Sequence, residues 1–219
     1  MRLFKSFSKF KNNIAIIDNE QSKLSYKEVL NKINEVKKKV RKRSLILIIS
    51  QNTLGSLLSY IFCVLNNHVG IIINSKTSKN NIIKICKNYQ PNFIFISKKT
   101  KSILKNICTE DCSLFDQVLM KNKLKKKIKL NNNLSLLLST SGSMGSLKFV
   151  KLSRKNLKYN ADSIIRYLNI NNKDSTITNL PISYSYMLSV VNTHLDVGGT
   201  IIISNYSLIE KGFWKIYKN

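Results

Sequence analysis

Apolar runs and amphipathic segments alternate along most of this chain. Continuous apolar runs at 45–50 (LILIIS), 69–74 (VGIIIN) and 93–97 (FIFIS) are typical of strands buried on both faces. The segments at 24–40 and 78–89 repeat their apolar residues at helical spacing. Because strands that alternate with helices form βαβ units, the pattern predicts an α/β fold of mainly parallel sheets with helices on their faces.

Polar residues mark the starts of the predicted helices. Ser25, Asn52 and Ser78 each precede an apolar-periodic segment, and we expect each to cap the helix that follows. Pro91 is expected to stop the third of these helices, because proline lacks the N–H that continues a helix.

The second half of the chain repeats the alternation. A strand at 134–141 and a strand at 148–153 flank a glycine-containing loop, and Ser153 is expected to cap the next helix. The remaining predicted elements are helices at 155–169, 184–198 and 207–219 and strands at 14–18, 175–180 and 199–204.

We divide the chain into a first α/β unit at 14–97, a connector at 98–133 and a second α/β unit at 134–219. The connector contains one short predicted helix, at about 101–108, and a possible strand at 117–120. Because its apolar periodicity is weak and it carries a basic run, we expect it to be a loosely ordered seam.

The charge balance raises a further class of partner. The chain has 37 Lys and Arg against 11 Asp and Glu, a net charge of +26. Such a balance suits a protein that binds nucleic acid or an anionic membrane surface. This binding stays an alternative function. The basic residues are nevertheless scattered, and no nucleic-acid recognition motif accompanies them, so we expect no specific nucleic acid partner. With 43% hydrophobic residues the chain can build a core.

The four cysteines predict neither a disulfide framework nor a zinc site. Cys63 and Cys86 lie in apolar helical patterns, and Cys108 and Cys112 have no matching second pair. We therefore expect no metal site and a reducing, cytoplasmic setting. The longest apolar runs are far too short for a transmembrane segment.

The two histidines carry little chemistry in the sequence. His68 and His194 have no carboxylate or cysteine partner in sight. We expect both to be structural histidines whose hydrogen bonds are satisfied, and not bases or ligands.

The glycine-containing loop, STSGSMGSLKFVKLS at 139–153, is the main candidate for chemistry. Glycines let a backbone approach phosphate closely, hydroxyls donate hydrogen bonds, and lysine adds a mobile cation. Taken alone, the residues fit a surface turn rich in small residues as well as a phosphate loop. The candidate phosphate ligands are Thr140, Ser141, Gly142, Ser143, Gly145 and Lys148.

TSGSMGSLKFV at 140–150 resembles the phosphate loop of the AMP-forming adenylation enzymes, the family of acyl-CoA synthetases and other adenylate-forming ligases. LSRKNL at 152–157, NLPISYSYMLSVVNTHLDVGGTIII at 179–203 and LSYKEV at 24–29 resemble further segments of that family. The resemblance covers nearly the whole chain and implies the N-terminal part of the family's large domain, a partial AMP-binding domain.

The resemblance implies a function as well as a fold. Such enzymes join a carboxylic acid to the α-phosphate of ATP, with Mg²⁺, and pass the acyl group to a thiol of CoA or of a phosphopantetheine carrier protein. The loop residues would then hold the ATP phosphates, and Tyr184 would border the acyl substrate pocket. Tyr184 equally suits a packing aromatic residue at a helix start.

The chain departs from the family pattern in two respects. Met144 replaces a threonine, Leu147 replaces a proline and Phe149 replaces a glycine, and a thioether is a poor phosphate ligand. Family members are more than twice as long, and their catalytic lysine and adenine and ribose motifs are expected beyond residue 219. We therefore expect an N-terminal fragment that is inactive alone and needs a C-terminal half; a catalytically dead scaffold or interaction protein is the alternative.

Overall fold

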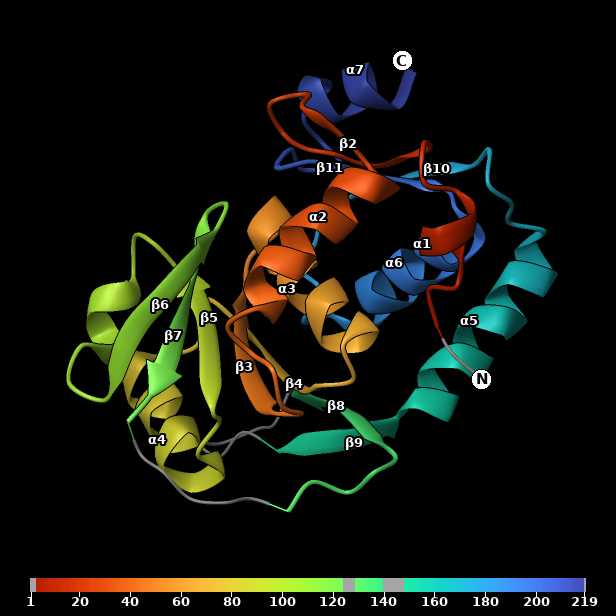
Figure 1. The fold of residues 1–219 in the computed structure, drawn as a ribbon. Helices are drawn as coiled ribbons and strands as arrows, with labels where there is room; N and C mark the ends of the chain where they lie inside the picture. The colour runs from red at the N-terminus through yellow and green to blue at the C-terminus, as the bar shows by residue number, and fades with distance from the viewer. Residues whose placement is uncertain (1–2, 124–128, 140–147, 219) are drawn as a thin grey trace.

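The computed structural model describes residues 3–123, 129–139 and 148–218, which form two β-sheets and the helices that pack on them (Figure 1). The larger sheet has the strand order β6-β7-β5-β3-β4-β8-β9, and the smaller has the order β10-β11-β1-β2. The strands of the larger sheet are β3 Leu45–Ser50, β4 Val69–Asn74, β5 Phe93–Ser97, β6 Cys108–Leu114, β7 Gln117–Asn122, β8 Leu134–Ser139 and β9 Phe149–Ser153. Those of the smaller sheet are β1 Ile14–Ile17, β2 Lys23–Ser25, β10 Ser175–Thr178 and β11 Thr200–Ile203.

Parallel pairing holds the centre of each sheet. In the larger sheet β5, β3, β4 and β8 run parallel, and in the smaller sheet β10, β11 and β1 run parallel. Antiparallel strands complete the edges. All six residues of β3 are buried, as expected for a central strand covered on both faces. The predicted α/β class with mainly parallel central strands is thus confirmed.

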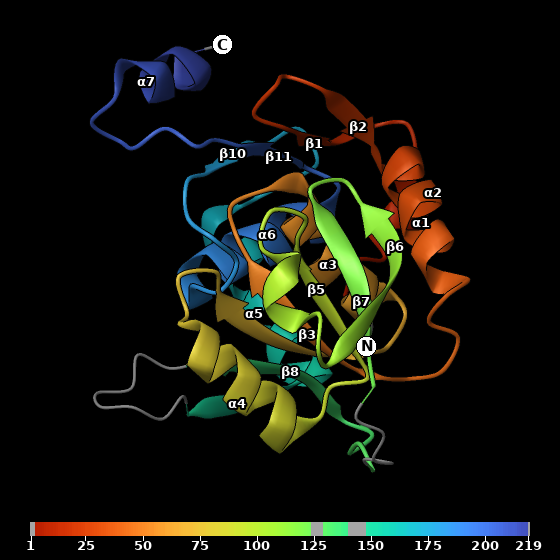
Figure 2. The same cartoon turned by 90° about the vertical axis from the view of Figure 1, so that its left-hand side faces the viewer.

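The helices are α1 Ser6–Lys9, α2 Tyr26–Lys37, α3 Leu54–Leu65, α4 Lys79–Tyr89, α5 Arg154–Leu168, α6 Ser185–Val197 and α7 Lys211–Lys218. They divide the core into two parts. One apolar cluster joins the inner face of the larger sheet, α2, α3, α6 and the smaller sheet, whereas α4 covers the opposite face of the larger sheet with a second cluster (Figures 1 and 2). A helical layer is therefore shared between the two sheets.

Side-chain caps begin most of these helices where the sequence predicts. Ser25, Ser78 and Ser153 cap α2, α4 and α5, and Ser25 and Ser153 each complete a reciprocal capping box. The prediction for α3 is wrong, because Thr53 caps that helix and the side chain of Asn52 bonds elsewhere. Asn52 and Thr53 are adjacent and are both good capping residues, so the sequence alone could not decide which of them caps α3.

The expected seam at 98–133 requires a correction. Its first part forms a short 3-10 helix at Lys101–Leu104, and β6 and β7 then form a hairpin on the edge of the larger sheet. Gly55 lets α3 approach this hairpin, because a Cβ atom there would lie 2.6 Å from the carbonyl oxygen of Leu114. The basic residues at 124–128 lie outside the described residues.

Both sheets combine strands from the two predicted units. β1, from the segment 14–97, pairs with β11, and β8, from the segment 134–219, pairs with β4. The division of the chain into those units and a connector therefore stays a prediction about domains, while the sheets themselves are shared.

The N-terminal segment, for which the sequence predicted no element, packs on the helical layer. The ring of Phe7 lies 4.7 Å from that of Tyr26, measured between centroids, and Phe4 contacts Tyr60 edge to face. The backbone N–H of Phe4 donates to Asp196 of α6, which also pairs with Lys158 of α5. Phe4 thus ties the N-terminal segment to α6 and, through Asp196, to α5.

The cysteines are structural. Cys63 and Cys86 are buried and unpaired, and burial raises the pKa of the Cys86 thiol to about 12, so that it stays uncharged near neutral pH. None of the helices in the described ranges is long and apolar enough to cross a bilayer.

His68 differs from the expected satisfied histidine. Its side chain is 3% exposed and stacks at 4.9 Å on Phe62, and its Nδ1 accepts a hydrogen bond from the backbone N–H of Ser44. Its Nε2 has no hydrogen-bond partner among the described residues. Burial, with help from Arg43 and Lys37, lowers the pKa of His68 to about 4. His194 instead bonds the carbonyl oxygen of Val190 through Nδ1.

The lowered pKa predicts a pH-dependent stability. The unfolded chain binds a proton at His68 below its ordinary pKa of 6.5, whereas the folded chain does so only below about 4. The contribution of His68 is therefore complete above pH 6.5 and is lost as pH falls toward 4, with a slope of up to about 1.4 kcal/mol per pH unit. The free energy of unfolding, measured with urea from pH 7 to pH 4.5, should show this slope. The slope should be smaller for His68→Gln. Equal slopes for the two proteins would contradict the assignment.

Candidate functional site

Polar residues follow four parallel strands at their carboxyl ends. Asn52 and Asn74 follow or end β3 and β4 of the larger sheet, and Asn179 and Asn205 follow β10 and β11 of the smaller sheet. In open α/β sheets, ligands bind at the carboxyl ends of the strands. The two sheets bring these ends together, and the residues there are the candidate site.

The carboxyl ends enclose a cavity of 420 Å³. Its walls come from the loops after β3, β4, β10 and β11 and are mostly polar. They are formed by Gln51, Asn52, Thr53, Asn74, Ser75, Lys76, Asn179, Leu180, Pro181, Tyr184 and Asn205. We call this the carboxyl-edge cavity.

Asn52 joins the two sheets at the floor of the cavity. Its side-chain amide donates to the carbonyl oxygens of Thr178, at 2.8 Å, and of Ser204, at 2.7 Å. Its Oδ1 accepts a hydrogen bond from the Thr178 hydroxyl at 3.3 Å. The side-chain amide of Asn52, just after β3, therefore supplies hydrogen bonds to the carbonyl oxygens at the ends of β10 and β11. It links the two sheets at this edge.

Hydrogen-bond donors dominate the chemistry of the cavity. None of the described residues that line it is acidic, and the exposed Lys76 supplies a cation at its rim. Asn74 holds this loop, since its Oδ1 accepts from the backbone N–H of Lys76 at 2.8 Å. The carboxylate of Asp116, which accepts from the hydroxyl of Thr53 at 2.8 Å, does not line the cavity. Amide, hydroxyl and ammonium donors suit an anion.

Tyr184 lies where the chain enters α6 and lines the carboxyl-edge cavity. Its side chain is 48% exposed, and its backbone N–H donates to the carbonyl oxygen of Pro181. The residue is thus a wall of the cavity, and its contact with an acyl group stays a prediction.

The predicted phosphate loop begins at the same edge of the larger sheet. β8 runs parallel to β4 and ends at Ser139, which pairs with Phe149 at the start of β9. Lys148 is exposed beside that pair. The remaining predicted phosphate ligands, Thr140, Ser141, Gly142, Ser143 and Gly145, and the substitutions Met144 and Leu147, lie outside the described residues.

Sequence reasoning missed Asn52, Asn74 and Lys76 as residues of this site. A signal was present, because a polar residue ends or directly follows each of these parallel strands, and an asparagine ends or stands within two residues of the end of β3, β4, β10 and β11. Which carboxyl ends face one another depends on the strand order of two sheets, and local patterns do not carry that information. Within the described residues there is no group of three or more His, Cys, Asp or Glu that could hold a metal ion.

The comparison with protein families decides the family. The family model of the AMP-binding enzymes matches residues 3–218. This chain belongs to the AMP-binding enzyme family. The resemblance inferred from the loop and its flanking segments is thereby confirmed. None of the curated proteins compared with the chain matches it.

Solved structures of adenylate-forming ligases share the fold. O-succinylbenzoate coenzyme A synthetase (MenE) from Bacillus subtilis, in complex with AMP, is 16% identical, with a TM-score of 0.76 over 98% of this chain and 58% of that one. ATP-bound MatB from Rhodopseudomonas palustris is 17% identical, with a TM-score of 0.75 over 91% of this chain and 45% of that one. VinN is 14% identical, with a TM-score of 0.75 over 93% of this chain and 56% of that one. The chain thus spans about half the length of these proteins.

The amide of Asn52 gives a prediction about stability. In Asn52→Asp a carboxylate faces the carbonyl oxygens of Thr178 and Ser204, so that the Ser204 carbonyl loses its donor and both carbonyl oxygens meet a negative charge, while Thr178 keeps the backbone N–H of Ser204. We expect the free energy of unfolding in urea to fall by about 2–4 kcal/mol. Asn205→Asp, at an exposed position of the same rim, is the matched control and should change it by less than about 0.5 kcal/mol. Equal losses in the two variants would show that Asn52 does not join the sheets.

Proposed function

We propose that this chain is the N-terminal part of an ATP-dependent, AMP-forming acid–thiol ligase, in which the carboxyl-edge cavity and the adjoining loop bind the nucleotide phosphates. The observation that carries the proposal is the family match over residues 3–218 together with the position of Lys148 and Ser139 at the edge where the cavity opens. The reaction would join a carboxylic acid to the α-phosphate of ATP and release pyrophosphate.

The described donors fit the phosphate groups of ATP. Lys76 and Lys148 are exposed cations at this edge, and the loop between β8 and β9 adds hydroxyls and glycines at Thr140, Ser141, Gly142, Ser143 and Gly145. Since no acidic residue of the described lining could ligate Mg²⁺, we propose that the ion is held through the phosphate oxygens. The bound ion would neutralise phosphate charge.

Tyr184 and the loop that precedes it are proposed to border the carboxylic acid. The position of these residues supports the proposal, because they line the cavity on the side of the smaller sheet. The acceptor of the acyl group is proposed to be a thiol, of CoA or of a phosphopantetheine carrier protein. One relative with this fold is named a coenzyme A synthetase. A cytoplasmic setting is also proposed, supported by the four unpaired cysteines.

A C-terminal half is proposed as the partner of this chain. The chain spans 58% of MenE and 45% of MatB, so that much of their length has no counterpart here. Exposed apolar side chains gather on α7 and the segment before it, which extend beyond the smaller sheet in both views (Figures 1 and 2). These are Tyr206, Leu208, Ile209, Trp214 and Tyr217. A surface of this kind suits an interface with further protein.

The chain alone is expected to bind MgATP weakly, with a dissociation constant of about 1 mM or higher, and to catalyse no exchange. Phosphate contacts must offset the translational and rotational freedom lost on binding, about 4–15 kcal/mol, without the adenine and ribose contacts. Co-expression or fusion with a segment carrying the later family motifs should produce acid-dependent exchange of pyrophosphate into ATP. Lys148→Ala should lower that exchange at least about tenfold.

Lys151→Ala is the matched control, because Lys151 is an exposed lysine of β9, the strand that Lys148 directly precedes, and should leave the exchange unchanged. Met144→Thr should raise it, since a hydroxyl replaces a thioether. Exchange by the isolated chain would contradict the proposed need for a C-terminal half. If the joined protein shows no pyrophosphate exchange with a broad panel of acids, either with Met144 or as Met144→Thr, the alternative of a scaffold without catalysis is favoured.

A further inference from the structure

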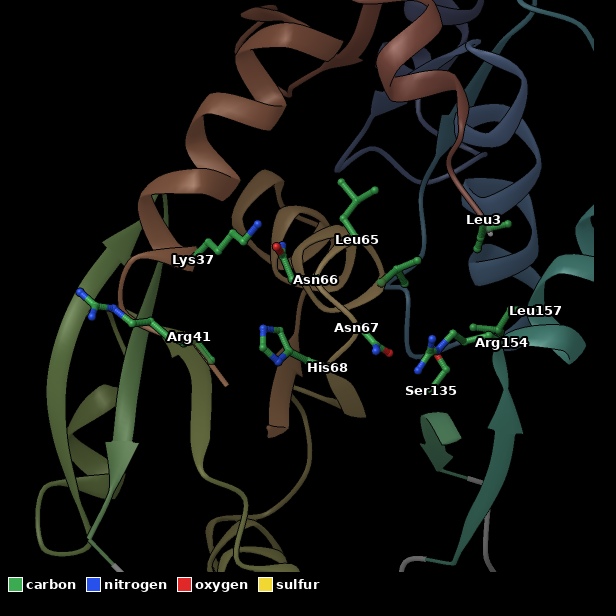
Figure 3. Close-up of a pocket in the computed structure, with 12 residues that line it drawn as sticks. Leu3, Lys37, Arg41, Leu65, Asn66, Asn67, His68, Ser135, Arg154 and Leu157 are labelled. Carbon is green, nitrogen blue, oxygen red and sulfur yellow. The ribbon is translucent and has the colours of Figure 1, made fainter. Parts of the chain in front are cut away.

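A second cavity lies at the amino ends of the strands, away from the carboxyl-edge cavity. It has a volume of 510 Å³ and is formed by the ends of α2 and α3, the start of α5 and the N-terminal segment (Figure 3). It is lined by Leu3, Lys37, Val40, Arg41, Val64, Leu65, Asn66, Asn67, His68, Ser135, Arg154 and Leu157. We call it the amino-edge cavity. The family chemistry at the opposite edge does not use it.

His68 lines this cavity and carries a buried, unpaired donor. Because the Ser44 N–H donates to Nδ1, the neutral ring carries its proton on Nε2. That N–H is buried and has no acceptor among the described residues, although His68 lines the cavity. A buried donor without an acceptor costs free energy, so the cavity calls for an acceptor that the described protein groups do not supply.

Cations surround the same space. Figure 3 shows Lys37 on one side of the cavity and Arg154 on the other, with His68 between them, while the guanidinium of Arg41 points away. Lys37 and Arg154 have no ion pair with an acidic residue among those described, and no described residue of the lining is acidic. Arg154 uses one N–H on the carbonyl oxygen of Asn132 and keeps other donors.

The rest of the wall is apolar. Leu3, Val40, Val64, Leu65 and Leu157 line the cavity beside the cations. An inorganic ion would leave this apolar surface in contact with water, whereas an organic body attached to the anionic group would cover it.

We propose that the amino-edge cavity binds a small organic anion, with a phosphate or carboxylate head at His68 Nε2 and an apolar body against the leucine and valine side chains. The head accepts the hydrogen bond from Nε2, and the exposed side chains of Lys37 and Arg154, which stand on opposite sides of His68, turn toward the head when it binds. The ligand is thus distinct from the nucleotide proposed at the carboxyl edge, and the two proposals stand or fall separately.

The two histidines of the chain provide a local readout. Imidazole ¹⁵N–¹H spectra of the labelled chain at pH 7 would be followed during titration with phenyl phosphate, benzoate, inorganic phosphate and phenol. Phenyl phosphate or benzoate should shift His68 Nε2 with a saturable curve and leave His194, which bonds Val190, as the internal reference. Inorganic phosphate and phenol, each lacking one half of the ligand, should bind at least about tenfold more weakly.

Matched variants test the residues of the site. Lys37→Gln and Arg154→Gln should each raise the dissociation constant about tenfold, because each removes a charge-assisted hydrogen bond. Lys38→Gln and Lys155→Gln, at exposed neighbouring positions outside the lining, are the controls and should not change it. Lys148→Ala should also leave the His68 response unchanged, which separates this site from the phosphate loop.

Three results would overturn the proposal: no saturable shift of His68 with either organic anion, equal binding of phenol, or the same loss for Lys155→Gln as for Arg154→Gln. The absence of a saturable shift would mean that water alone accepts the hydrogen bond of Nε2. Far-UV circular dichroism of each variant checks that the fold is kept, and all five substituted positions are exposed.

Discussion

The meeting of the two sheets at their carboxyl ends depends on one half-buried amide. Asn52 leaves the end of β3 and donates to the carbonyl oxygens of Thr178 and Ser204 in the smaller sheet. The Thr178 carbonyl also accepts from the backbone N–H of Ser204, whereas without the amide the Ser204 carbonyl would lose its donor, at a cost of about 1–3 kcal/mol. The shared helical layer supplies the apolar area, and Asn52 sets where the carboxyl ends meet. The candidate site is a consequence of this contact, because its walls come from the loops of both sheets.

Much of the fold could be predicted from the sequence because its signals are local. The continuous apolar runs of β3 and β4 and the capping serines Ser25, Ser78 and Ser153 depend on neighbours within a few residues. The possible strand at 117–120 lies within β7, but β6 was missed, because most of its residues are exposed or half-buried and show no regular alternation. Asn52 was assigned to a helix cap because its true partners are more than 120 residues away.

The candidate site could be predicted only in part. The loop motif gave the family, which the family match confirms, and the apolar pattern gave the two strands that flank the loop, β8 and β9. The asparagines of the other loops could not be joined to it before the strand order was known. The amino-edge cavity was beyond sequence reasoning altogether, because it needs the orientation of His68 and the approach of α2 to α5 around it. Two of the many cations of this chain, Lys37 and Arg154, line the amino-edge cavity.

The central claim, that the nucleotide binds at the carboxyl edge, is tested most directly in the chain joined to a segment that carries the later family motifs, by hydrogen exchange followed by mass spectrometry with and without saturating MgATP. The account predicts slower exchange in peptides that contain Asn74–Lys76, the β8–β9 connection and the segment before α6. It predicts unchanged exchange around His68 and the start of α5. Protection confined to the amino edge, or none at any concentration of MgATP, would contradict it.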